Sequence, residues 1–252
     1  MLGEVWEDAS NKSAYGVRRR YLQGGQLDSV TNYPFKEDIL RFAATGDAGR
    51  LRNTVEHIIN NYPKRTLDRL VNILGTHDTV RVLTALGDNG DVSGRDERAV
   101  ARITDRPAAI RRLKLATVLQ YMLPGVPCVY YGDEAGMEGF EDPMNRQGFP
   151  WGREDQRLLT LYRTLGKLRK ERESLQSGDL TYLTAEGGLL LFCRTADGER
   201  TYTALNTGDT PRDVTLPWPN GFAVDAVTLQ RFWVRDGMLR LTLPPCDGVI
   251  LV

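Results

Sequence analysis

Four short motifs carry most of the side chains in this sequence that could do chemistry, and each follows an apolar run. They are Gly3-Glu4-Val5-Trp6, Asn32-Tyr33-Pro34-Phe35, Gly75-Thr76-His77-Asp78 and Tyr130-Tyr131-Gly132-Asp133-Glu134. Carboxylates and a histidine can transfer protons or stabilise positive charge, and aromatic rings offer flat apolar surfaces to a ligand. Functional side chains of βα barrels lie at the carboxyl ends of strands, so the placement of these motifs favours an active site.

The elements that must position these motifs follow a βα pattern over the first 175 or so residues. Strands are predicted at 1–6, 29–35, 70–74 and 126–131. Helices are predicted at 36–45 and 51–60, with a break at 45–49, and around 115–122 and 158–168. Four βα units amount to half of an eight-stranded barrel, although the length of the chain would suit a whole one.

From about Gly178 the sequence changes to short β-type runs separated by turn signals. These runs cover 189–194, 200–205 and 232–243, the last folded at Asp236-Gly237. We therefore predict an α/β fold with two domains: residues 1–175 form half of a (β/α)8 TIM barrel, and residues 176–252 form a small antiparallel β-sandwich.

The composition narrows the functional classes. Lysine and arginine (33) balance aspartate and glutamate (33), so no net charge attracts nucleic acid. No apolar run approaches the roughly 20 residues of a membrane span. Three separated cysteines, Cys128, Cys193 and Cys246, form neither a disulfide framework nor a zinc cluster, and we expect buried thiols in a reducing, cytoplasmic compartment.

The four motifs, extended by Leu123-Pro124-Gly125-Val126-Pro127-Cys128-Val129 before the last, resemble the α-amylase family of glycoside hydrolases in order and separation. The resemblance is closest to the neopullulanase and cyclomaltodextrinase branch and spans essentially the whole chain. It implies that the four strands are strands 5 to 8, the carboxy-terminal half of the barrel. The implied substrates are α-1,4-linked glucans of starch, maltooligosaccharides or cyclodextrins. It implies no cofactor or metal in this chain and leaves calcium open for the other half.

By this resemblance Glu4 matches the family's general acid and base, and Asp78 matches the carboxylate that stabilises the charged transition state. His77 would donate to the same sugar. We expect Glu4 to lie in an apolar setting beside Trp6. The alternative for Glu4 is a surface residue of an acidic stretch, and a lone His-Asp pair is otherwise a helix cap or an ion pair.

Sugar binding is expected from aromatic side chains and from one loop. The aromatic candidates are Trp6, Tyr33, Phe35 and Trp151. The loop 136–146 resembles the loop after the eighth strand, and the resemblance implies that Asp142 and Arg146 contact the glucan outside the cleavage site. Alternatively, Asp142-Pro143 only starts a turn and Arg146 is a solvated charge. For Asn145 both interpretations, a glucan contact and a structural turn, stay open. Asp133 and Glu134 are expected to cap a segment or to pair with arginines.

The family's nucleophile has no match in this sequence. In the family it lies in a Gly-Phe-Arg-x-Asp type motif, which this sequence does not contain. Retaining hydrolysis needs this second carboxylate. We therefore expect a portion of a retaining hydrolase that is inactive alone. A noncatalytic glucan-binding fragment and a half-barrel assembly unit are the alternatives. Because half a barrel leaves two strand edges open, we expect a homodimer or association with the missing half.

Overall fold

The computed structural model describes residues 1–87, 90, 92, 94–219 and 221–252. Its amino-terminal part contains four short strands: β1 (Leu2–Gly3), β4 (Ser29–Val30), β5 (Val71–Asn72) and β6 (Val126–Pro127). β1 pairs with β4, β5 pairs with β6, and a bridge from Thr31 to Val71 joins the two pairs, all in parallel. The order is therefore β1-β4-β5-β6, and over the described residues this sheet stays open rather than closing into a barrel.

These strands lie where the sequence predicts them, but they are much shorter. The prediction was wrong for 33–35, which form the first turn of helix α1 (Tyr33–Thr45) instead of the end of a strand. The reason is local: the Asn32 side chain accepts a hydrogen bond from the Phe35 backbone N–H, and Pro34 occupies the first turn. An asparagine cap followed by proline is a helix start.

The predicted long helices are confirmed, each with wider bounds: α1, α2 (Ala48–Asn61), α6 (Arg106–Met122) and α7 (Gln156–Glu171). The predicted break falls at Gly46, which has φ 78°, and Asp47 then caps α2 by accepting from the Arg50 backbone N–H. Several short elements were not predicted. They are the hairpin β2 (Ser13–Ala14) and β3 (Val17–Arg18), helices α3 (Lys64–Leu67), α4 (Val82–Leu86), α5 (Arg95–Val100) and α8 (Glu173–Gln176), and the 3-10 turn Met144–Arg146.

The carboxy-terminal part is built of antiparallel strands. One sheet has the order β14-β9-β8-β7, from β7 (Asp179–Glu186), β8 (Leu189–Ala196), β9 (Glu199–Asn206) and β14 (Asp247–Leu251). Two further pairs are β10 (Arg212–Pro217) with β13 (Met238–Leu243), and β11 (Phe222–Val224) with β12 (Arg231–Trp233). The single hairpin predicted for 232–243 is wrong, since β12 and β13 pair with different strands and only an Arg235–Met238 bridge spans the turn.

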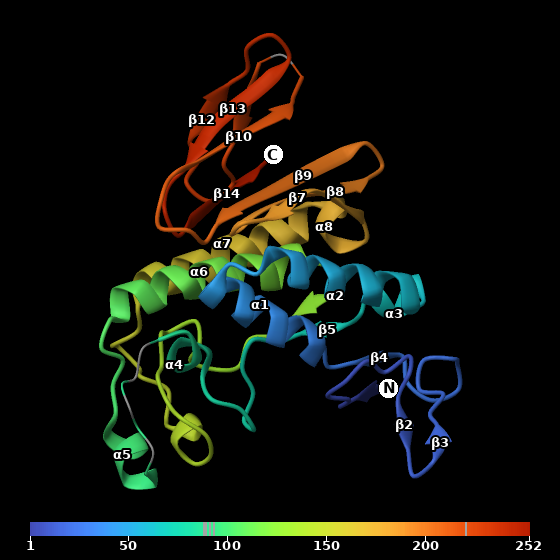
Figure 1. Cartoon of the computed structure of the whole chain (residues 1–252), viewed down its shortest axis with the longest axis vertical. Helices are drawn as coiled ribbons and strands as arrows, with labels where there is room; N and C mark the ends of the chain where they lie inside the picture. Colours follow the sequence, from blue (N-terminus) through green and yellow to red (C-terminus); the bar gives the residue numbers. More distant parts are fainter. Residues whose placement is uncertain (88–89, 91, 93, 220) are drawn as a thin grey trace.

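Figure 1 shows how these parts are layered, with the antiparallel strands at the top and the short parallel strands with their loops at the bottom. Helices α1, α2, α6 and α7 lie between them and form most of the main core. Buried Arg194 of β8 ties the upper layer to the helices, because its guanidinium donates to the Met122 carbonyl at 2.8 Å and to Gly178. The domain boundary after residue 175 stays a prediction.

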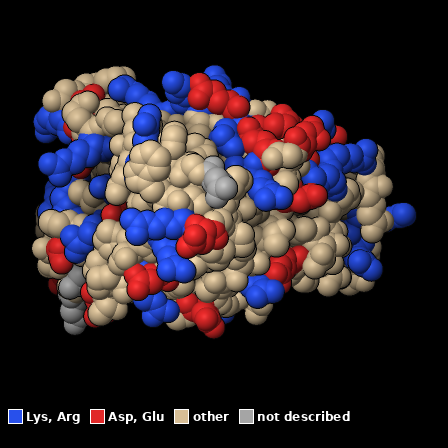
Figure 2. All heavy atoms as spheres, turned by 90° about the horizontal axis from the view of Figure 1, so that it is seen from above, with Lys and Arg blue, Asp and Glu red and all other residues tan. Residues whose placement is uncertain are grey.

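The surface carries both signs of charge. Figure 2 shows lysine and arginine interspersed with aspartate and glutamate on the face seen from above. Among the described residues, no helix is both long and apolar enough to cross a membrane. The cysteines are free, as expected, but only Cys193 is buried, and the expectation of a buried thiol was wrong for Cys128, which is exposed just beyond the open-edge strand β6.

Candidate active site

Glu4 directly follows β1, and its carboxylate is held by Tyr33, the first residue of α1. The Tyr33 hydroxyl donates to Glu4 Oε1 at 2.8 Å, and the indole of Trp6 stacks on the Tyr33 ring with centroids 4.1 Å apart. The three candidates therefore lie together. The expectation of an apolar setting for Glu4 was wrong, because its side chain is exposed and Trp6 stacks on Tyr33 instead of covering the carboxylate.

Tyr33 is a permanent hydrogen-bond donor at this site. Its ring is buried, and burial together with the hydrogen bond to Glu4 and the negative charges of Glu4 and Asp78 raises the pKa of Tyr33 to about 12. The phenol consequently keeps its proton at any physiological pH. Asp78 acts on the Tyr33 hydroxyl through its charge, and Glu4 and Asp78 follow the parallel strands β1 and β5, whose carboxyl ends lie at the same edge of the sheet.

Asp78 lies in a tight turn after β5 and is surrounded by basic groups. Its backbone N–H donates to Thr76 Oγ1 at 3.2 Å, which shapes the turn. Its Oδ2 lies 3.3 Å from His77 Nε2, and its Oδ1 lies 3.4 Å from Arg146 Nη2. Arg146 Nε in turn lies 3.3 Å from Asp142 Oδ1. His77, Asp78, Asp142 and Arg146 thus form one exposed charged cluster.

Asn145 explains why Arg146 reaches Asp78. Its side chain is buried, and Nδ2 donates at 2.8 Å to the carbonyls of His77 and Thr79. The Asn145 amide therefore connects the loop after β6 to the turn after β5. This connection places the neighbouring Arg146 beside Asp78. Asn145 therefore makes a structural contact between two loops, and a contact of Asn145 with the glucan stays a prediction.

Arg81 was missed by the sequence reasoning, although it follows Asp78 by three residues. It is fully buried and donates from Nη1 to the Tyr131 carbonyl at 2.8 Å and to Asp133 Oδ1 at 3.2 Å. Its guanidinium lies over the ring of Tyr130, 4.7 Å from the centroid. As expected, Asp133 pairs with an arginine and Glu134 accepts from a backbone N–H, that of Gly132, at 2.8 Å.

Asp133 is a buried titratable group below the exposed cluster. Burial raises its pKa to about 7, while the nearby Arg81 charge acts in the opposite direction. Gly75 leaves the room this carboxyl needs, since a Cβ there would lie 2.9 Å from Asp133 Oδ2. The pair supports the loops that carry Asp78 and Tyr131 rather than facing a ligand.

Two aromatic candidates do not join the site. Phe35 is 0% exposed and belongs to the main hydrophobic core, so its expected role as a sugar platform was wrong. Its position in the first turn of α1 directs it inward, toward the face that the helix buries. Trp151 is 81% exposed and packs on Phe149 with centroids 4.6 Å apart, without a ring contact to Trp6 or Tyr33.

The described residues contain no group of three or more histidine, cysteine, aspartate or glutamate side chains arranged to hold a metal ion. The chemistry this arrangement can do is that of two exposed carboxylates, one with a phenolic donor and one with an imidazole and a guanidinium beside it.

Comparison with known proteins decides the family. The family model of the α-amylase catalytic domain matches residues 1–150 of this chain. The chain belongs to the α-amylase family. An amylopullulanase from Thermoanaerobacter thermohydrosulfuricus is 33% identical over 100% of this chain and 18% of its own length. A cyclomaltodextrinase from Geobacillus thermopakistaniensis is 32% identical over 99% of this chain and 39% of its own length.

A solved cyclomaltodextrinase structure superposes on this α-amylase family chain with a TM-score of 0.79 and 26% identity, covering 100% of this chain and 40% of that one. The resemblance inferred from the four motifs is thereby confirmed. The chain spans well under half the length of these three relatives. The family is one of glycoside hydrolases, and the four motifs lie within the matched residues 1–150.

Proposed function

We propose that this chain supplies two of the three catalytic carboxylates of a retaining glycoside hydrolase that cleaves α-1,4-glucosidic bonds in starch-derived glucans, maltooligosaccharides or cyclodextrins. The strands β1, β4, β5 and β6 would be the fifth to eighth of the family barrel. The observation that supports this best is the hydrogen bond from the Tyr33 hydroxyl to Glu4, beside which burial, Glu4 and Asp78 all raise the pKa of Tyr33. The relatives' names, amylopullulanase and cyclomaltodextrinase, support the substrate class.

In the proposed reaction, Glu4 gives its proton to the glycosidic oxygen as the carbon–oxygen bond breaks. A nucleophilic carboxylate from outside these 252 residues, roughly 5 to 5.5 Å from Glu4, forms the glycosyl ester. Glu4 then takes a proton from water, and the hydroxyl replaces the ester with net retention. Tyr33 would stabilise the ionised Glu4 carboxylate between the two steps by its hydrogen bond.

Asp78 would stabilise the positive charge that develops on the sugar ring, with His77 donating to the same sugar. In the free chain the Asp78 carboxylate is occupied by His77 and Arg146, so a sugar must replace or share these exposed contacts. Trp6 stacks on the buried Tyr33 ring and would offer its half-exposed indole to the glucan, and Asp142 and Arg146 would bind it beyond the cleavage site. No nucleophile is proposed within the chain, and so we expect it to be inactive alone.

Two alternatives remain open as proposals. As a noncatalytic glucan-binding fragment, the chain would use the half-exposed Trp6 and the charged cluster without cutting. As an assembly unit, it would serve to complete a barrel through its open strand edges. A cytoplasmic location is also a proposal, and the three free cysteines support it.

Calorimetric titration with maltoheptaose, followed by chromatography of the products, tests the proposal. Saturable binding that is weakened in both E4Q and D78N supports the site. Binding without any shortened product agrees with a chain that lacks its nucleophile, whereas product release by the chain alone would contradict the proposed division of the active site. Absence of binding would leave the assembly unit as the better account.

A further inference from the structure

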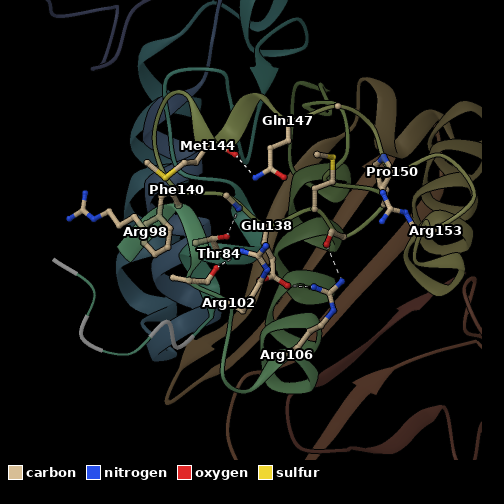
Figure 3. Close-up of a pocket in the computed structure, with 17 residues that line it drawn as sticks. Thr84, Arg98, Arg102, Arg106, Glu138, Phe140, Met144, Gln147, Pro150 and Arg153 are labelled. Atoms are coloured by element: carbon tan, nitrogen blue, oxygen red, sulfur yellow. Dashed lines mark hydrogen bonds and ion pairs between the residues drawn. The ribbon is translucent and has the colours of Figure 1, made fainter. Parts of the chain in front are cut away.

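A polar cavity of about 260 Å³ lies apart from Glu4 and Asp78, between the segment that follows α4 and the loop that follows β6. Neither carboxylate nor Tyr33 lines it. Figure 3 shows side chains entering it from α4 and α6 and from the loop around Glu138 and Gln147. This volume is near the lower end for a small-molecule site and suits a ligand of monosaccharide size.

Arginine dominates the charged lining of this cavity. Four guanidinium groups line it, while Glu138 is the single carboxylate among the described lining residues. Glu138 is already neutralised, because Arg106 forms an ion pair with it and the Ile103 backbone N–H donates to it at 3.2 Å. Figure 3 draws the contact between Arg106 and Glu138 as a dashed line. The cavity therefore holds more positive than negative charge.

Two of the four arginines, Arg102 and Arg153, have a positive charge that can pair with an anionic ligand. Arg98 lies 3.2 Å from Glu141, which stands outside the lining. Arg102 donates only to the carbonyl of its neighbour Ala101, at 2.7 Å, and neither Arg102 nor Arg153 has an ion-pair partner among the described residues. Because a guanidinium presents paired N–H donors, two of them facing one cavity fit a doubly charged, multi-oxygen anion.

The remaining lining is partly apolar. Phe140, Met144 and Pro150 line the same cavity, and Figure 3 shows Pro150 beside Arg153. A ligand here would place an anionic group on the arginines and an uncharged body against these side chains. A neutral glucan would leave both free guanidinium groups without a counter-charge, so it fits this cavity less well than an anion does.

We propose that this cavity binds a phosphoryl group, either as free phosphate or as the phosphate ester of a sugar. Arg102 and Arg153 are the residues that bind the phosphoryl oxygens. The site does not depend on the proposed hydrolase function, since none of the catalytic candidates takes part in it. Its wall includes Met144 and Gln147, which flank the Asn145–Arg146 segment bonded to the turn of Asp78.

Calorimetric titration at low ionic strength tests this proposal with three probes: inorganic phosphate, glucose 1-phosphate and glucose. The variants are R102A/R153A and the control R240A, which removes an exposed arginine on β13 far from the cavity. We expect glucose 1-phosphate to bind saturably, with affinity reduced roughly tenfold or more in R102A/R153A and unchanged in R240A. Added salt should weaken binding to the unaltered chain.

The probes distinguish the two sources of the phosphoryl group. Equal affinity for phosphate and glucose 1-phosphate supports free phosphate, and tighter binding of the ester supports a sugar phosphate. The proposal is overturned if neither anion binds saturably, if glucose binds as well as glucose 1-phosphate, or if R102A/R153A binds like the unaltered chain. Both replaced side chains are exposed, so thermal melting should show that the double variant still folds.

Discussion

At the residue scale, Asp78 is a carboxylate whose partners are all exposed. Its carboxylate contacts His77 and Arg146, at 3.3 and 3.4 Å, on a surface that water reaches. Exposed ion pairs contribute little to stability, about 0 to 1 kcal/mol. The contacts of Asp78 therefore add little to the stability of the fold and leave its carboxylate accessible to a ligand. A carboxylate that stabilises a transition state must be accessible in this way.

The substitution Asp78→Asn should therefore separate binding from stability. We expect the affinity for maltoheptaose to fall roughly tenfold or more, because the loss removes hydrogen bonds to a charged acceptor. The melting temperature should stay close to that of the unaltered chain. Calorimetric titration and thermal melting measure the two effects, with Asp213→Asn on β10 as the control. Unchanged affinity in D78N would remove Asp78 from the glucan site.

Asp133 gives a pH dependence whose sign is fixed by its burial. Its folded pKa of about 7 is raised above the ordinary value of 3.8, so the folded state holds a proton that the unfolded state has lost between these values. The contribution to stability is complete below about pH 3.8 and is lost as pH rises through about 7. Each unit of pH in this window would lower the free energy of unfolding by at most about 1.4 kcal/mol.

The variant Asp133→Asn isolates this effect, because it keeps an acceptor for Arg81 but cannot ionise. Urea unfolding from pH 4 to 8 should show that the unaltered chain loses stability relative to D133N as pH rises. A difference between the two chains that stays constant across this range would show that Asp133 ionises normally in the folded chain. Other titrating groups are common to both chains and cancel in the difference.

At the element scale, one loop and one turn act together. The loop after β6 carries Asn145 and Arg146, and the turn after β5 carries Asp78. Their connection is the Asn145 amide, buried between two carbonyls. Buried acceptors that lose their donor are costly, by about 1 to 3 kcal/mol each.

Asn145→Ala should accordingly lower both stability and glucan affinity. We expect the free energy of unfolding to fall by about 1 to 3 kcal/mol and the affinity for maltoheptaose to weaken, since Arg146 is no longer held near Asp78. Asn53→Ala, at an exposed asparagine of α2, is the control and should leave both close to the unaltered values. A variant N145A with normal stability would mean that other contacts position the loop.

Helix starts could be predicted from the sequence because their signals are local. Asn32, Asp47 and Asp155 each cap a helix through their own side chains, and three long helices follow. Strand lengths and partners could not be predicted, because they depend on distant segments. The run 232–243 shows this: its turn signal at Asp236-Gly237 is real, yet its two halves pair with β11 and β10.

In the candidate site, too, the residues in local motifs could be predicted, and the contacts between distant segments could not. Glu4 and Asp78 follow strands in family motifs, and the structure brings both toward Tyr33. The inward direction of Phe35 depends on where α1 starts, and the burial of Arg81 depends on Tyr131 and Asp133, which are 50 and 52 residues away. The sequence shows that Arg81 follows Asp78 by three residues, but it does not show which residues Arg81 contacts.

At the scale of the whole molecule, the parallel sheet ends in two unpaired strands. β1 and β6 have no partner on their outer sides among the described residues, and Leu2 and Val126 are 55% and 48% exposed there. Open edges with apolar side chains favour association with other strands. We therefore expect the chain to form a homodimer or to bind a polypeptide that continues the sheet.

Light scattering at several protein concentrations tests this expectation. The unaltered chain should be dimeric or associate further, and L2K/V126K should shift it toward the monomer, because a lysine on each edge opposes pairing. Lysine at the exposed Val100 of helix α5, which lies on no strand edge, serves as the control and should leave the state of association unchanged. A strictly monomeric unaltered chain would contradict the expectation.

The central claim is that Glu4 and Asp78 are two parts of an active site whose nucleophile lies outside this chain. The most direct measurement is reducing-sugar release from maltohexaose by the chain alone, and by the chain mixed with the separately expressed preceding part of the barrel of the 32% identical cyclomaltodextrinase. The account predicts no release by the chain alone, release by the mixture, and loss of that release by a factor of roughly a thousand or more in E4Q. Hydrolysis by the chain alone, or a mixture as active with E4Q as with Glu4, would contradict it.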